Sequence, residues 1–252
     1  MMKSFLTTLL VAWTTFSSVA WASEEANNLN VTLNGQTYIF ERPVRLASML
    51  SIVSDKNDWY WPASTVFDLN ANDAELEREA IKAEISALLP LITRHSDKYA
   101  ALGHLYRQIS SWDLHTRVVM PVSYNRARLI AEENPMFQFG RYAIELNTRP
   151  KNVHVWGAVK KPQAYLHQNG TPIYTAIDEV KKGKRPDRSH VFIIDPQGNI
   201  EKKGIAYWNL DASQIMPGSQ IYVPINSELF SDRIEKLNWR VAALAVNRVL
   251  PQ

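Results

Sequence analysis

The stretch VHVWGAVKKPQAYL, which spans residues 153–166, decides the fold of this chain. Its valines recur at even spacing, which is the period of a half-buried β-strand. Gly157 interrupts the strand, where a bulge or a sharp bend is expected. Pro162 then turns the chain, because proline fixes φ and cannot donate a hydrogen bond to a sheet. Tyr165 begins a returning strand, so the stretch predicts a hairpin.

A short helix is expected directly after this hairpin. Thr171 can cap its first turn, and Pro172 suits the first helical position, where its missing N–H would have no partner in any case. The apolar residues of the segment fall on one helical face: Ile173, Ala176, Ile177 and Val180.

Strand, bulge, turn, strand and capped helix in this order resemble the signature of the soluble ligand-binding β-grasp (SLBB) domain. The residues that match that signature are Val153, Val155, Gly157, Val159, Pro162, Tyr165, Gly170, Thr171, Ala176 and Ile177. Gln163 departs from it, because the pattern usually has glycine there, and glutamine makes a type II turn less comfortable. Such domains occur in outer-membrane polysaccharide exporters and in periplasmic proteins that work beside them.

The same order of elements is expected once more, near the start of the chain. Residues 31–40 read as a hairpin with Asn34-Gly35 at the turn, and residues 44–53 read as a helix. The predicted fold class is therefore α+β, with two tandem β-grasp domains, a helical hairpin inserted in the first, and a C-terminal amphipathic helix. The expected boundaries are residues 23–149 and 150–225 for the two domains and 226–252 for the C-terminal helix.

The helical hairpin inserted in the first domain is expected at about residues 72–113. Asn72 and Glu75 have the spacing of a capping box at its first helix. The expected inward side chains of that helix include Leu76, Ile81, Ile85 and Leu88. The chain returns to a strand near Arg117.

The predicted C-terminal helix has a wide apolar stripe. Its members are Phe230, Ile234, Leu237, Trp239, Val241, Ala242, Leu244, Ala245, Val246 and Val249. Such a face can pack on its own protein, dock on a partner or insert in a membrane. Packing is the favoured reading, and membrane contact is not favoured, because one short charged helix would need many copies to form a pore.

Composition and the N-terminus limit the classes of function. Residues 1–22 read as a signal peptide cleaved after about Ala22, which predicts an exported, periplasmic protein. The sequence has no cysteine, which excludes disulfides and thiolate chemistry. The formal charge of +3 is too mild to indicate nucleic-acid binding.

Several motifs together resemble the GfcC-type capsule biosynthesis family. They are the signal peptide, residues 59–63 (WYWPA), Arg117, residues 134–136 (NPM), Arg149-Pro150, the SLBB signature and the C-terminal helix. The resemblance runs over nearly the whole mature chain. It implies a periplasmic accessory protein for a capsule or another extracellular polysaccharide, and it establishes no catalytic reaction.

Known catalytic and metal-binding patterns are not found in the sequence. The six histidines do not have zinc-ligand spacing, and no G-x-S-x-G nucleophile elbow occurs, so neither a metal nor another cofactor is predicted. A carboxylate pair for glycoside chemistry is defined by distance in space, and the sequence leaves that alternative open.

Three groups of residues are candidate binding sites. Trp59, Trp61 and Trp112 could pack on sugar rings, although burying the joint between the first sheet and the insertion is the favoured reading. The basic run Lys181, Lys182, Lys184, Arg185 and Arg188 could bind an acidic polysaccharide or an acidic partner, with a solvated loop as the default. Arg117, which matches an arginine of the family, could hold a carboxylate or phosphate with its planar fork or form a structural salt bridge with the insertion.

The sequence thus predicts a non-enzymatic periplasmic factor in polysaccharide assembly or export. It would bind the extracellular polysaccharide or dock on the outer-membrane polysaccharide exporter. An edge strand of a β-grasp sheet could serve that docking by strand addition. Two alternatives are a polysaccharide-modifying enzyme and a pore-forming export component that uses the C-terminal helix.

Overall fold

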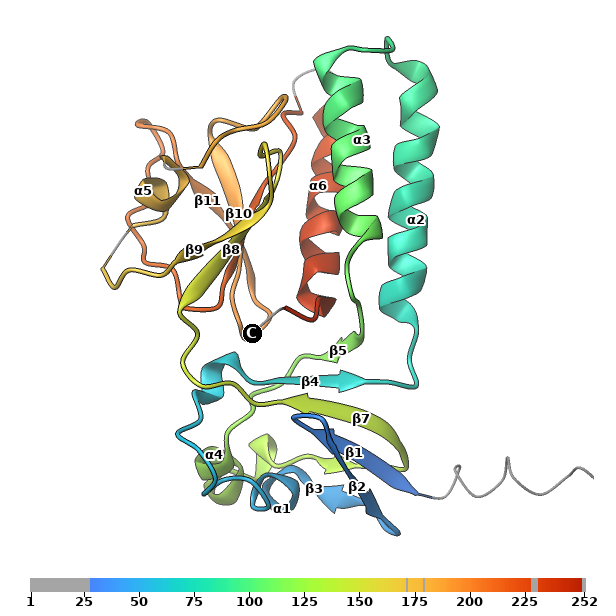
Figure 1. Cartoon of the computed structure of the whole chain (residues 1–252), viewed down its shortest axis with the longest axis vertical. Helices are drawn as coiled ribbons and strands as arrows, with labels where there is room; N and C mark the ends of the chain where they lie inside the picture. Colours follow the sequence, from blue (N-terminus) through green and yellow to red (C-terminus); the bar gives the residue numbers. More distant parts are fainter. Residues whose placement is uncertain (1–27, 171, 179, 228–230, 251–252) are drawn as a thin grey trace, which may run out of the picture.

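The structure, a computed structural model, describes residues 28–170, 172–178, 180–227 and 231–250 (Figure 1). The predicted signal peptide, the predicted cap at Thr171 and the predicted stripe residue Phe230 lie outside these residues. The described chain forms two five-stranded sheets, one small two-stranded sheet and six α-helices.

The first sheet has the order β2-β1-β7-β4-β5. Its strands are β1 (Leu29–Leu33), β2 (Gln36–Phe40), β4 (Thr65–Asp68), β5 (Thr116–Val118) and β7 (Gly140–Glu145). β1 runs parallel to β7, and the other neighbours pair antiparallel. We call this sheet, with the helices α1 (Leu46–Leu50) and α4 (Tyr124–Leu129), the first unit.

The second sheet repeats this topology. Its strands are β8 (Asn152–Gly157), β9 (Gln163–Leu166), β10 (His190–Ile194), β11 (Ile200–Gly204) and β12 (Gln220–Val223). Read from one edge, their order is β9-β8-β12-β10-β11, and only β8 and β12 pair in parallel. If the five strands of each sheet are numbered along the chain, both sheets have the spatial order 2-1-5-3-4. This shared order confirms the predicted duplicated β-grasp fold. The second unit also contains α5 (Ile173–Asp178).

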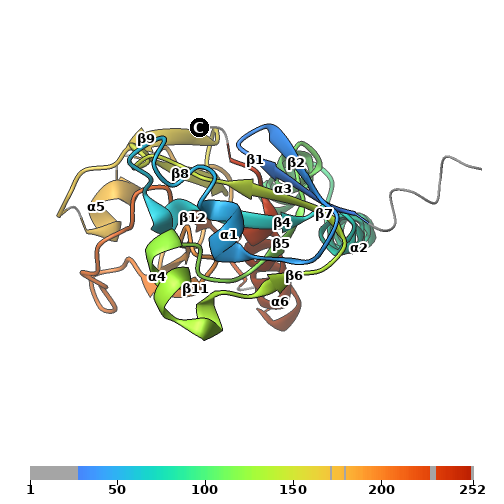
Figure 2. The same ribbon diagram turned by 90° about the horizontal axis from the view of Figure 1, so that it is seen from below.

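The first sheet has its core on one face. Residues of β1 alternate between buried and half-buried, as a sheet covered on one side requires. Leu29, Val31 and Leu33 pack with α1, α4 and neighbouring strands. Figure 2, which views the molecule from below, shows α1 and α4 on the lower side of this sheet.

The second sheet is covered on both faces. All four residues of β12 are buried. In a strand with one face in water, every second residue would be exposed, so both faces of this strand are covered. Trp156, Tyr222 and Phe192 stack on the face toward α6 (Ser231–Leu244). Figure 1 shows α5 on the opposite side of the sheet.

The helical insertion consists of α2 (Asp73–Leu88) and α3 (Asp97–Ser110) and connects β4 to β5 of the first sheet. Its apolar face nevertheless joins the core of the second unit, since Ile81, Ile85 and Leu102 belong to the same buried cluster as Trp156. In Figure 1, α2, α3 and α6 lie side by side next to the second sheet. The predicted insertion is therefore present, and it packs on the other unit.

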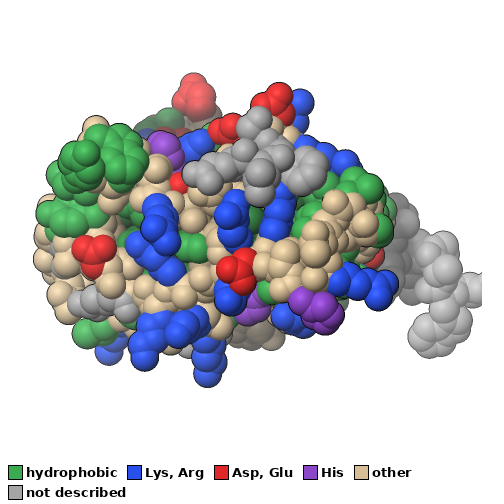
Figure 3. Space-filling view, turned by 90° about the horizontal axis from the view of Figure 1, so that it is seen from above, with side chains coloured by type: hydrophobic (Ala, Val, Ile, Leu, Met, Phe, Trp, Pro, Cys, Tyr) green, Lys and Arg blue, Asp and Glu red, His purple; other side chains and the backbone are tan. Residues whose placement is uncertain are grey.

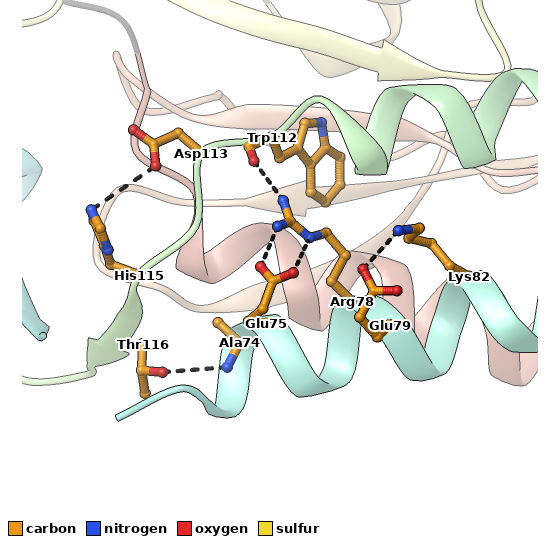
Figure 4. Close-up of polar contacts among 9 residues, drawn as sticks. All are labelled: Ala74, Glu75, Arg78, Glu79, Lys82, Trp112, Asp113, His115 and Thr116. Carbon is orange, nitrogen blue, oxygen red and sulfur yellow. Dashed lines mark hydrogen bonds and ion pairs between the residues drawn. The ribbon is translucent and has the colours of Figure 1, made fainter. Parts of the chain in front are cut away.

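Polar contacts fix the base of the insertion to the strand that follows it (Figure 4). The Arg78 guanidinium donates a 2.7 Å hydrogen bond to the Trp112 carbonyl and forms an ion pair with Glu75. The Ala74 backbone N–H donates to the Thr116 hydroxyl at 3.3 Å. The start of α2 is thus held against the chain leaving α3.

Three local predictions were wrong in detail. The helix expected at residues 44–53 is shorter, because Val44–Arg45 forms β3, which pairs with β6 (Met136–Phe137). The Asn72 side chain makes no capping hydrogen bond, and Leu76 is 59% exposed because Ala74 is turned inward instead. α6 ends at Leu244, and a 3₁₀ turn (Ala245–Asn247) leads into an extended end.

The apolar face of α6 packs inside the protein. Ile234, Leu237 and Val241 are fully buried in the core of the second unit. On its other side, Arg240 donates to Glu77 at 2.7 Å and to Glu84 at 2.6 Å, which ties α6 to α2. None of the helices in the described residues is both long and apolar enough to cross a membrane.

Candidate functional site

A cavity of about 330 Å³ lies between the two units, and we call it the inter-unit cavity. The first sheet contributes residues from the face that α1 and α4 leave uncovered. Phe67 pairs with Arg117, and Thr65 pairs with Glu145, so strand register places these four side chains on one face. The rest of the lining comes from the linker at residues 147–152, from the second sheet and from the chain end after α6.

Arg117 reaches across this cavity to the second unit. Its guanidinium donates a short hydrogen bond to the Pro196 carbonyl, and its backbone N–H donates to the Asn247 side chain at 2.9 Å. The Nε atom is buried and has no hydrogen-bond partner among the described residues. Burial lowers the pKa of the guanidinium to about 10, and the charge of Asp195 offsets part of that shift. The salt bridge with the insertion that the sequence left open is not present in the described part of the chain.

Arg248 is a second cation in the cavity, half-buried like Arg117, and sequence reasoning missed it. It was expected inside the C-terminal helix, whereas it lies beyond α6 in extended chain that bridges to Leu114. Its guanidinium donates to the Gln220 side chain at 2.7 Å and lies 4.5 Å from the ring centroid of Trp112. Burial lowers its pKa to about 10. A charged residue at the end of an apolar stripe was the only signal in the sequence.

Neither carboxyl group of the cavity forms an ion pair with these two arginines in the part of the chain that the structure describes. Both carboxylate oxygens of Asp195 accept hydrogen bonds from Asn199, at 2.9 Å and 2.8 Å, within a β-turn. Burial raises the pKa of Glu145, which favours its neutral form. Burial and the charge of Arg248 both lower the pKa of His154. The lining contains four Arg or Lys side chains and two acidic ones, so the cavity is positive overall.

The three predicted tryptophans have packing contacts in the structure. Trp59 and Trp61 pack against the core of the first unit, and the Trp59 indole donates to the Val53 carbonyl at 2.8 Å. Trp112 is buried and meets Trp156 edge to face at 4.8 Å. None of these three lines the inter-unit cavity. Trp112 supports it indirectly, because it lies under Arg248, and direct glycan contact by these rings stays a prediction.

The predicted basic run, residues 181–188, forms a loop that we call the basic loop. It lies at the end of the molecule where α3 begins, since Lys184 pairs with Asp97 at 2.9 Å. Figure 3 views this end and shows Lys and Arg side chains gathered on it. The cavity and the basic loop are at opposite ends of the second sheet, because one adjoins the turn after β10 and the other precedes β10. The structure does not combine the predicted residues into one site.

Metal binding finds no support in the described residues. No group of three or more His, Asp or Glu side chains there is placed to hold an ion.

The fold and the cavity define an α+β protein of two β-grasp units with an arginine-lined cavity between them. Residues 164–250 match the family model described as "Capsule biosynthesis GfcC C-terminal". The chain is also 25% identical over 198 residues to the uncharacterized protein YjbG of Escherichia coli (strain K12), across 77% of this chain and 78% of that protein.

These matches confirm the predicted resemblance to GfcC-type proteins. The matched segment runs from β9 to the end of the described chain, so it contains both the basic loop and Arg248.

Proposed function

We propose that this protein is a non-enzymatic periplasmic accessory factor in the biosynthesis or export of a capsule or exopolysaccharide. It binds an acidic part of the polymer in the inter-unit cavity, where Arg117 and Arg248 contact a carboxylate or another anionic substituent. The observation that carries the proposal is that two half-buried guanidiniums line one cavity and neither forms an ion pair within the described residues.

Removing a charge from water without an opposite partner costs free energy of desolvation, up to several kcal/mol for a fully buried ion and less for these half-buried arginines. An anion bound in the cavity would offset part of this cost. A carboxylate fits this role, because it can accept two parallel N–H bonds from a guanidinium.

The acidic residues of the cavity favour binding over hydrolysis. A glycosidase needs two free carboxyl groups on opposite sides of the scissile bond. Asp195 is occupied in its own turn, which leaves Glu145 as the available carboxyl group. The packed apolar face of α6 likewise supports a binding role over the pore-forming alternative.

Calorimetric titration with oligogalacturonate, an acidic probe, tests the proposal. Arg117→Met should weaken binding by roughly tenfold or more, because a hydrogen bond to a charged group contributes about 1.5–3 kcal/mol. Arg42→Met, at an exposed position outside the cavity, is the matched control and should bind as the wild type does.

Two results would contradict the proposal. Equal affinity of wild type and Arg117→Met would show that Arg117 of the cavity does not bind the polymer. A shortening of a capsular polysaccharide on incubation with wild-type protein, lost in Glu145→Gln, would favour the enzyme alternative.

A further inference from the structure

Two aromatic side chains project from the loop after β11, residues 205–212, which we call the aromatic loop. Tyr207 is 89% exposed and Trp208 is 65% exposed. Their rings meet edge to face with centroids 5.0 Å apart. Large aromatic side chains stabilise a protein mainly when they are buried in its core. Exposed rings such as these two contribute little to folding, and exposed apolar patches often mark interaction sites.

The base of the aromatic loop is held tightly. The Asn209 side chain accepts a hydrogen bond from the Ala206 backbone at 3.0 Å and donates to the Ser189 carbonyl at 3.0 Å. Gly204 is required here, because a Cβ at this position would lie 1.9 Å from the Asn209 carbonyl oxygen. The rings are therefore presented on a fixed support, which reduces the entropy lost when a ligand binds.

The same hydrogen bonds place the aromatic loop beside the basic loop. Ile205 also donates to the Ser189 carbonyl, at 2.8 Å, and Arg188 directly precedes Ser189. Among the described residues, Lys181, Lys182 and Arg188 form no ion pair.

The acidic groups that adjoin these loops are already engaged. Asp187 accepts backbone hydrogen bonds from Ser189 and His190, and Asp211 pairs with Lys203 at 3.2 Å. Because Asp97 pairs with Lys184, the basic side chains of this end that form no ion pair within the described residues include Lys181, Lys182 and Arg188. Burial, together with the positive charge of Arg185, lowers the pKa of the nearby Lys98.

We propose that the aromatic loop and the basic loop form a second contact for the acidic polysaccharide, at the end of the second unit opposite the inter-unit cavity. Sugar C–H faces pack on Tyr207 and Trp208, and carboxylates of the same chain pair with Arg188 and the loop lysines. This inference rests on the proposed function, because it assigns another contact to the same polymer. A chain bound at both ends would gain avidity without new contacts at either site.

Affinity electrophoresis through gels that contain polygalacturonate tests this contact, with neutral dextran as the comparison polymer. The double variant Tyr207→Ala/Trp208→Ala should lose affinity for polygalacturonate by about tenfold, as expected for losing aromatic packing. Trp208→Phe should retain most of it. Phe139→Ala removes an exposed aromatic ring from the first unit and should bind normally.

Arg117→Met, run in parallel, separates the two proposals. If the double variant binds as the wild type does while Arg117→Met is weakened, the proposed second contact is wrong and the cavity remains the proposed binding site. The reverse result rejects the cavity and keeps the second contact. If the double variant loses only binding to phosphatidylglycerol vesicles, the surface is a membrane contact and the inference is overturned.

Discussion

The two units share one strand order and differ in how their sheets are covered. The first sheet has helices on one face, and the second has α5 on one face and α3 and α6 on the other. The insertion leaves the first sheet and covers the second. The bare face of the first sheet is the one that carries Arg117 and Glu145 into the inter-unit cavity. The cavity forms at this face because the first unit supplies helices to its neighbour and has none of its own on this side.

The largest expected effect tests the core of the doubly covered sheet. Trp156 is buried, stacked on Tyr222 at 4.3 Å and edge to face with Trp112. Trp156→Ala should lower the free energy of unfolding by about 3–5 kcal/mol, because it removes a large side chain and leaves a cavity. Urea unfolding measures the loss.

Trp156→Phe is the matched variant for this core. It keeps most of the packing and removes an indole N–H that has no partner in the described structure, so it should cost much less. A loss below about 1 kcal/mol for Trp156→Ala would contradict the shared core of insertion and second unit.

Substitutions of two glycines with positive φ, one in each unit, compare how tightly the two sheets are packed. Gly157 in β8 has φ +96°, and a Cβ there would lie 2.3 Å from the Val223 carbonyl oxygen. Gly35 in the first hairpin has φ +83° and open space around it. Gly35→Ala should cost about 1–2 kcal/mol from the left-handed backbone alone, whereas Gly157→Ala adds a steric clash and should cost distinctly more. Equal losses in thermal unfolding would show that β8 and β12 can separate easily.

A smaller effect is expected where α6 meets the insertion. Arg240→Met removes the ion pairs with Glu77 and Glu84. These groups are partly exposed, so the loss should be only about 0.2–1 kcal/mol, and high salt should reduce it. A loss of several kcal/mol in chemical unfolding would mean that polar contacts, not the buried apolar face, hold α6 in place.

The smallest predicted change concerns His154 and pH. Burial and Arg248 lower its pKa in the folded state, so the unfolded chain binds more protons below the ordinary value of 6.5. This contribution to stability is present above pH 6.5 and is lost as the pH falls below it. Arg248→Met should raise the His154 pKa toward 6.5 in an NMR titration, and an unchanged value would show that the two groups do not interact.

Local patterns in the sequence were sufficient for both β-grasp units. Asn34-Gly35 and the residues around Pro162 define hairpins by turn chemistry that acts over a few residues, which a sequence displays directly. The sequence could not predict in the same way which sheet the insertion packs against. Ile81 and Ile85 show a helical face that must be buried, but they do not show which sheet buries it.

The candidate site was only partly predictable for the same reason. Arg117 was singled out, yet its contact with Pro196 joins residues 79 positions apart. Arg248 was hidden because the apolar stripe was extended past the end of α6 at Leu244. Tyr207 and Trp208 were overlooked, although two aromatic residues between Gly204 and Asn209 could have indicated an exposed loop.

The most direct test of the inter-unit cavity is an NMR titration that follows arginine side-chain Nε–H signals as oligogalacturonate is added. The account predicts saturable shifts of the Arg117 and Arg248 signals, with the Arg42 signal unmoved. If the polymer fragment binds and the Arg117 and Arg248 signals stay in place, these two guanidiniums are not its binding site.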